Sequence, residues 1–194
     1  FKLEKDVVQA EIDIIKEMGV EIKTGVEVGK DITLDELRAQ GYKAFYIAIG
    51  CQGGRLPGIP NDTAKGCASA VDLLKEVNAN EKYDIKGDVV VIGGGNVSMD
   101  AVRTAKRLGA KKVSIVYRRR VADMTALPGE IEGAVAEGIE LQTLKAPASI
   151  DVDENHHVKG IYVTPQMGSS IRDGRASIKP TGEEDIYIPC DVLI

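Results

Sequence analysis

The sequence predicts an α/β protein: a parallel sheet with helices on both faces, an antiparallel β excursion, and a separate N-terminal segment. Three observations support this class. Short apolar runs alternate with helical patterns between residues 89 and 141, and this order is typical of parallel strands joined by helices. Beyond Pro147 the helical period disappears and short β-like pieces follow. A stretch rich in glycine and proline, 50–60, sets the N-terminal segment apart.

The N-terminal segment contains two predicted helices and one predicted strand. Residues 6–18 carry apolar side chains at helical spacing and are followed by Gly19, which favours a helix end. Thr33 and Glu36 have the spacing of a capping box, which predicts a second, short helix. The apolar run 44–49 predicts a buried strand.

The main domain is predicted to span residues 62–194. Its expected helices are one that begins after Ser69, 97–108 and 128–137, and its expected parallel strands are 89–92, 113–117, 139–141 and 192–194. The antiparallel excursion is expected at 157–164, 176–179 and 185–188. The last parallel strand therefore returns to the sheet after the excursion.

Composition limits the classes of partner. The chain has 194 residues, with 30 acidic and 25 basic side chains and a net charge of −5. Such a chain has no general attraction for nucleic acid or anionic membranes. No apolar run approaches the roughly 20 residues that cross a bilayer, and no secretory signal is recognisable at the start. We expect a cytoplasmic protein with no nucleic-acid or membrane partner and, without a Cys-x-x-Cys pair, no metal site.

The most informative segment joins the first parallel strand to its helix. Three consecutive glycines, Gly93, Gly94 and Gly95, follow the strand, and Asn96 and Val97 open the helix. A dinucleotide pyrophosphate needs bare backbone and free amides at this point. We therefore expect a Rossmann-like domain in which these five residues hold the pyrophosphate. A purely structural turn and an S-adenosylmethionine site remain alternatives.

The end of the second strand indicates which dinucleotide binds. An NAD site places an acidic residue there, about 20 residues after the glycines. In this chain the strand ends at Tyr117, 24 residues after Gly93, and Arg118, Arg119 and Arg120 follow, with no acid before Asp123. Guanidinium groups suit a 2′-phosphate, which a carboxylate would repel. NADP(H) is therefore expected, held by Arg118 and Arg119 with Arg120 a weaker candidate; a solvated basic turn is the alternative.

These segments together resemble the NADPH-binding half of the glutamate synthase small (beta) subunit. The similarity is carried by residues 91–100, 103–110 and 116–119, and it continues upstream through 20–50. Downstream, Met124-Thr125-Ala126 is similar to a Met-Pro-Ala stretch of that family. Related pyridine nucleotide-disulfide oxidoreductase-like flavoproteins, including dihydropyrimidine and sulfide dehydrogenase types, share these segments.

The resemblance implies that residues 1–61 are part of an FAD domain with its linker and that 62–194 are the NADPH domain. In the full-length protein NADPH would transfer hydride to FAD, and iron–sulfur clusters would pass electrons to a large glutamate synthase subunit. No catalytic side chain is expected here, because the cofactors supply the chemistry. A second Gly-x-Gly-x-x-Gly for FAD does not occur, so we expect the remaining FAD and iron–sulfur portions elsewhere and this chain alone to be inactive. A non-catalytic NADP(H)-sensing module and a methyltransferase are the alternative functions.

Overall fold

The computed structural model describes residues 3–80, 83–172 and 175–194. The chain divides into two units, Phe1–Ile49 and Gly50–Ile194, and each unit is described by itself. The division falls within the predicted linker. The assignment of residues 1–61 to an FAD domain stays a prediction.

The first unit contains helices α1 (Lys5–Glu17) and α2 (Leu34–Ala39), as the sequence predicted. The capping box of α2 is complete: the Glu36 amide donates to Thr33 Oγ1 at 3.2 Å, and the Thr33 amide donates to the Glu36 carboxylate at 2.8 Å. Neither helix buries a residue. The unit therefore has the local signals of helices but no core of its own.

The predicted buried strand at 44–49 is not formed. This segment has no regular secondary structure, and Tyr46, Ile47 and Ile49 are 94%, 72% and 76% exposed. The physical reason is the lack of a partner, because a strand is stable only when a neighbour pairs with its backbone and covers its apolar face. Among the described residues of this unit, the only β pairing is an isolated bridge between Val28 and Ile32.

The second unit is built on a parallel sheet with the strand order β3-β2-β1-β8. Its strands are β1 (Asp88–Ile92), β2 (Lys112–Tyr117), β3 (Glu140–Thr143) and β8 (Val192–Leu193). All three pairings are parallel, and β8 returns to pair with β1 after the antiparallel region. This confirms the predicted sheet and its last strand.

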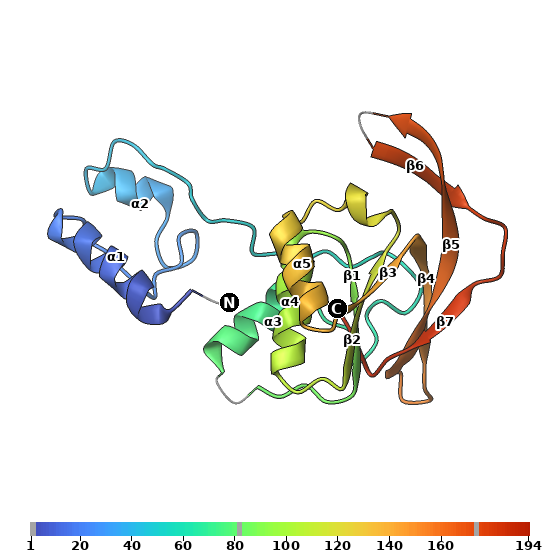
Figure 1. Ribbon diagram of the computed structural model, residues 1–194. Helices are drawn as coiled ribbons and strands as arrows, with labels where there is room; N and C mark the ends of the chain where they lie inside the picture. The colour runs from blue at the N-terminus through green and yellow to red at the C-terminus, as the bar shows by residue number, and fades with distance from the viewer. Residues whose placement is uncertain (1–2, 81–82, 173–174) are drawn as a thin grey trace. The chain divides into compact units, whose positions relative to one another are not determined.

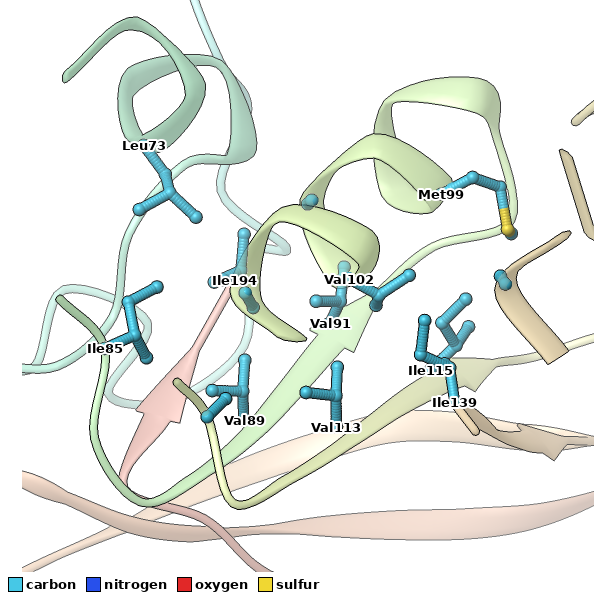
Figure 2. Close-up of a cluster of buried hydrophobic side chains, with 14 of the residues drawn as sticks. Leu73, Ile85, Val89, Val91, Met99, Val102, Val113, Ile115, Ile139 and Ile194 are labelled. Carbon is cyan, nitrogen blue, oxygen red and sulfur yellow. The ribbon is translucent and has the colours of Figure 1, made fainter. Parts of the chain in front are cut away.

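Three helices cover one face of the parallel sheet (Figure 1): α3 (Ala70–Ala79), α4 (Asn96–Arg107) and α5 (Pro128–Ala136). Val89 and Val91 of β1 point toward this face and lie in one apolar cluster with Met99 and Val102 of α4 (Figure 2). Alternate residues of one strand face opposite sides of a sheet. The neighbouring residue Val90 accordingly belongs to a different cluster on the other face.

The second face is covered by antiparallel strands, not by helices, and this corrects the predicted helices on both faces. The covering strands are β4 (Lys145–Val152), β5 (Val158–Arg172) and β7 (Ile186–Pro189), and β6 (Arg175–Pro180) extends the antiparallel region by pairing with the end of β5. Ile161 and Val163 of β5 pack with Val90 and Val116 of the parallel sheet. Only Leu144, at φ 55°, separates β3 from β4, so the chain has no room for a crossover helix there. The predicted antiparallel excursion is confirmed, with β4 as an additional strand.

Ion pairs connect α4 and α5. Arg103, whose side chain is 14% exposed, contacts Glu130 at 2.6 Å and Glu137 at 2.9 Å. Arg107 contacts Glu137 at 2.6 Å. The hydrogen bonds from Arg107, followed by those from Arg103, lower the pKa of Glu137 from 4.5 to about 2. This network fixes the helix that begins at the glycine loop.

We expect Glu137→Gln to lower the free energy of unfolding at pH 7 by about 1 kcal/mol, the size of a partly screened charged hydrogen bond. Because the pKa of Glu137 is lower in the folded protein, its contribution is complete above about pH 5 and disappears as the pH falls toward 2. Urea unfolding at several pH values measures the difference. Glu132→Gln, at an exposed position of the same helix, is the control, and a difference independent of pH would contradict the ionic origin.

Candidate nucleotide-binding site

The glycine loop lies at the carboxyl end of β1, between strands β2 and β8. Gly93 has φ +139°, and a Cβ there would lie 2.5 Å from Ser98 Oγ. Its amide donates to the carbonyl of Val116 on β2 at 3.0 Å. The first glycine thus allows the turn, and the small side chain of Ser98 packs directly beside it. Ligands of open α/β sheets bind at such a carboxyl edge, next to the strand at which the strand order reverses. In this sheet that strand is β1, which lies between β2 and β8.

Gly94 is enclosed by its surroundings. A Cβ at this position would lie 2.8 Å from the Tyr117 ring and 3.0 Å from the Met124 side chain. The Gly94 carbonyl accepts hydrogen bonds from the amides of Thr125 and Ala126, at 2.9 and 3.0 Å. This glycine therefore holds the loop against the segment after β2, and its predicted contact with the pyrophosphate stays a prediction.

Gly95, in contrast, faces open space. A Cβ there would have one neighbour within 4 Å, Thr125 Oγ1 at 3.5 Å. Gly95 is the N-cap of α4, and its carbonyl accepts from the amides of Ser98 and Met99. The earlier amides, those of Asn96 and Val97, precede the first helical hydrogen bond and are available to an anion. The first turn of α4 contains no acidic residue that would repel an anion at this positive end of the helix dipole.

The side chain of Asn96 makes a contact that is separate from its backbone amide. Asn96 Oδ1 accepts a hydrogen bond from the amide of Leu127 at 2.9 Å. It thereby joins the start of α4 to the start of α5. Sequence reasoning placed Asn96 in the site but did not anticipate this bond, because the partner is 31 positions away.

Arg118 and Arg119 leave the end of β2 beside the loop. Arg118 is exposed and Arg119 is partly buried. The Nε of Arg119 is buried and has no hydrogen-bond partner, and the ion pairs of the described residues include neither arginine. A buried donor without an acceptor is uncommon in a folded protein. Arg119 therefore has a hydrogen-bond donor that no acceptor within the protein uses.

Arg120 is engaged within the protein. Its guanidinium contacts the Asp123 carboxylate at 2.8 and 3.0 Å, and the Asp123 side chain is 4% exposed. The Tyr117 hydroxyl donates to the Asp123 carbonyl at 2.8 Å. The hydrogen bond to Asp123 raises the pKa of Arg120. These contacts shape the 3₁₀ turn Val121–Asp123 and separate Arg120 from the two arginines that have no acidic partner.

A pocket of about 260 Å³ lies at the carboxyl ends of β1 and β8. Ile92, Leu193 and Ile194 contribute the sheet side of the pocket, and Ser69 and Arg55 contribute the opposite rim. Sequence reasoning missed it, because its lining comes from segments far apart in the chain. Its largely apolar walls suit a flat ring with few polar contacts.

No group of three histidine, cysteine, aspartate or glutamate side chains converges in residues 3–80, 83–172 or 175–194. Within the same ranges, no helix has both the length and the apolar character that a bilayer span requires.

Solved structures and a family model identify the type of fold and the family. The structure of FprA from Mycobacterium tuberculosis in complex with NADPH has the same fold, with a TM-score of 0.70 and 18% identity over 97% of this chain and 57% of that chain. The model for "Pyridine nucleotide-disulphide oxidoreductase" matches residues 4–172. The chain belongs to this family, which confirms the resemblance drawn from the sequence and leaves the methyltransferase alternative without support.

Curated relatives match over the whole chain. It is 34% identical to the NADP(+)-dependent formate dehydrogenase subunit beta of Moorella thermoacetica, covering 28% of that protein. It is 33% identical to the NADPH-Fe(3+) oxidoreductase subunit beta of Geobacter sulfurreducens, covering 29% of it. It is also 33% identical to the glutamate synthase [NADPH] small chain of Escherichia coli, covering 43% of it. The chain thus spans less than half the length of these relatives.

The two loop glycines should differ in their effect on stability. We expect Gly94→Ala to lower the free energy of unfolding by about 1–3 kcal/mol, because its Cβ would overlap the Tyr117 ring. Gly95→Asp should leave the free energy of unfolding unchanged or raise it by up to about 0.5 kcal/mol, because aspartate is a slightly better N-cap than glycine. Urea unfolding followed by circular dichroism measures both. Equal destabilisation by the two substitutions would contradict the separation of roles.

Proposed function

We propose that this chain binds NADP(H) across the carboxyl edge of its parallel sheet. The observation that carries the proposal is the position of two arginines without acidic partners, Arg118 and Arg119, beside a glycine loop whose outer face at Gly95 is open. Guanidinium groups bind a phosphate with paired charged hydrogen bonds. In this arrangement the arginines hold the 2′-phosphate.

The loop provides the second part of the site. The amides of Asn96 and Val97, at the positive end of α4, hold the pyrophosphate above Gly95. The remaining nucleoside then extends past Ile92 toward the pocket at β8. Gly93 and Gly94 serve by shaping the loop and do not themselves need to touch the ligand. This division among the five loop residues is our refinement of the sequence-based expectation.

In the full-length protein, we infer, the chain delivers NADPH to a flavin. When bound, NADPH would supply hydride for FAD, and iron–sulfur clusters would provide the onward electron path; the residues of this chain would bind and orient NADPH. Residues 1–61 belong to the FAD domain in this proposal, and the other FAD and iron–sulfur portions come from the rest of the parent protein. The small chain of glutamate synthase supports this reading through its 33% identity, and a large glutamate synthase subunit is the corresponding partner.

Other electron acceptors are compatible with the same chain. The relatives include a formate dehydrogenase subunit and an NADPH-Fe(3+) oxidoreductase subunit at similar identity. Their names share the pyridine nucleotide and differ in the second substrate. Nucleotide specificity is therefore the part of the proposal that can be measured with this chain alone.

We expect the double substitution Arg118→Ala with Arg119→Ala to remove most of a preference for NADPH over NADH. Each charged hydrogen bond contributes on the order of 1.5–3 kcal/mol before solvent screening, so the preference should fall by at least about tenfold. NADH binding should change little, because its adenosine ribose has no 2′-phosphate. Calorimetric titration with both nucleotides at two salt concentrations measures this, with a weaker preference at high salt.

The matched control is Lys106→Ala with Lys111→Ala, which removes the same charge from the opposite end of α4 and from the start of the β2 segment. This control should leave the NADPH preference unchanged. A double arginine variant that keeps its preference, or that loses NADPH and NADH equally, would be inconsistent with a 2′-phosphate site.

Gly95→Asp should abolish binding of both NADPH and NADH while the protein stays folded. The carboxylate would occupy the open face of the loop, cap the amides that the pyrophosphate uses, and repel the phosphate charge. Calorimetry on variants with native circular dichroism provides the measurement. Retained affinity for either nucleotide would mean that the ligand does not cross this loop.

A further inference from the structure

The segment after the 3₁₀ turn is fixed to the glycine loop by its backbone. The amides of Thr125 and Ala126 both donate to the Gly94 carbonyl. The next amide, that of Leu127, donates to Asn96 Oδ1, and the Met124 side chain lies against Gly94. Four consecutive residues are thus held in place beside the loop. The side chain of Thr125 is positioned by bonds that do not involve its hydroxyl.

That hydroxyl lies on the open side of Gly95. Thr125 Oγ1 is 3.5 Å from the position of a Cβ on Gly95, and no other atom lies within 4 Å of that position apart from the immediate chain neighbours. Thr125 is exposed, and among the described residues its hydroxyl makes no side-chain hydrogen bond. A free hydroxyl donor therefore borders the open space at Gly95.

We propose that Thr125 Oγ1 donates a hydrogen bond to the pyrophosphate of the bound dinucleotide, an additional contact beyond the loop amides. This inference rests on the proposed function, because it assumes that a pyrophosphate lies above Gly95.

The location of the hydroxyl determines what it recognises. Arg118 and Arg119 follow β2 and are assigned to the 2′-phosphate, which only NADP(H) carries. Thr125 borders Gly95, where the pyrophosphate common to NADPH, NADH and ADP-ribose would rest. Loss of the hydroxyl should therefore weaken all three ligands equally. Adenosine 2′-monophosphate, which has no pyrophosphate, should be unaffected.

The test compares Thr125→Val, which keeps the branched shape without the hydroxyl, with Thr125→Ser, which keeps the hydroxyl. Calorimetric titrations use NADPH, NADH, ADP-ribose and adenosine 2′-monophosphate on the purified chain. We expect Thr125→Val to weaken the first three about tenfold, and Thr125→Ser to bind within about twofold of wild type. Thermal unfolding verifies the fold, and Thr125→Ala replaces valine if that variant is unfolded.

The outcomes separate this inference from the function on which it rests. Wild-type binding together with unchanged affinity in Thr125→Val would overturn the hydroxyl contact and leave the proposed function standing. A loss confined to NADPH and adenosine 2′-monophosphate would overturn it too, since the hydroxyl would then serve the 2′-phosphate. Failure of wild type to bind any of the four ligands would overturn the proposed function and this inference together.

Discussion

The close approach of Tyr117 to the backbone of Gly94 is the contact on which the site depends. A Cβ on Gly94 would lie 2.8 Å from the ring, so the two strand ends meet only because this residue lacks a side chain. The same approach lets the Gly94 carbonyl accept two amides from the segment after β2. The loop after β1 and the turn after β2 are consequently joined by backbone hydrogen bonds, so the nucleotide that we propose to bind there would meet preorganised donors.

Much of this arrangement could be predicted from the sequence, because the signals are local. The run 88–100 specifies strand, turn and helix within thirteen consecutive positions, and Gly93 and Gly94 stand where the backbone excludes a side chain. The covering of the second face could not be predicted in this way. Strands β1 and β2 are apolar on both faces, which predicts burial, but helices and an antiparallel sheet both bury such strands.

The three arginines after β2 also could not be told apart from the sequence. Three consecutive guanidinium groups look alike in the sequence, and their partners distinguish them in the structure. Arg120 has Asp123 three positions onward, with a nearly buried carboxylate, while Arg119 has a buried donor and no acceptor. Spacing of three residues permits such a pair without requiring it. The pocket beside Ile92 could not be predicted from local sequence signals, because its walls include residues as far apart in the sequence as Arg55 and Ile194.

The exposed helices of the first unit should unfold locally before the second unit does. Helix α1 has 13 residues and buries none of them, and isolated helices of this length are marginal in water. Backbone amides in α1 should therefore exchange with solvent through local openings of nearly zero free energy, whereas those of β1 should exchange only when the second unit unfolds. Proteases would find their first cleavage sites ahead of residue 50, and the slope of denaturant unfolding would report the surface of the second unit alone.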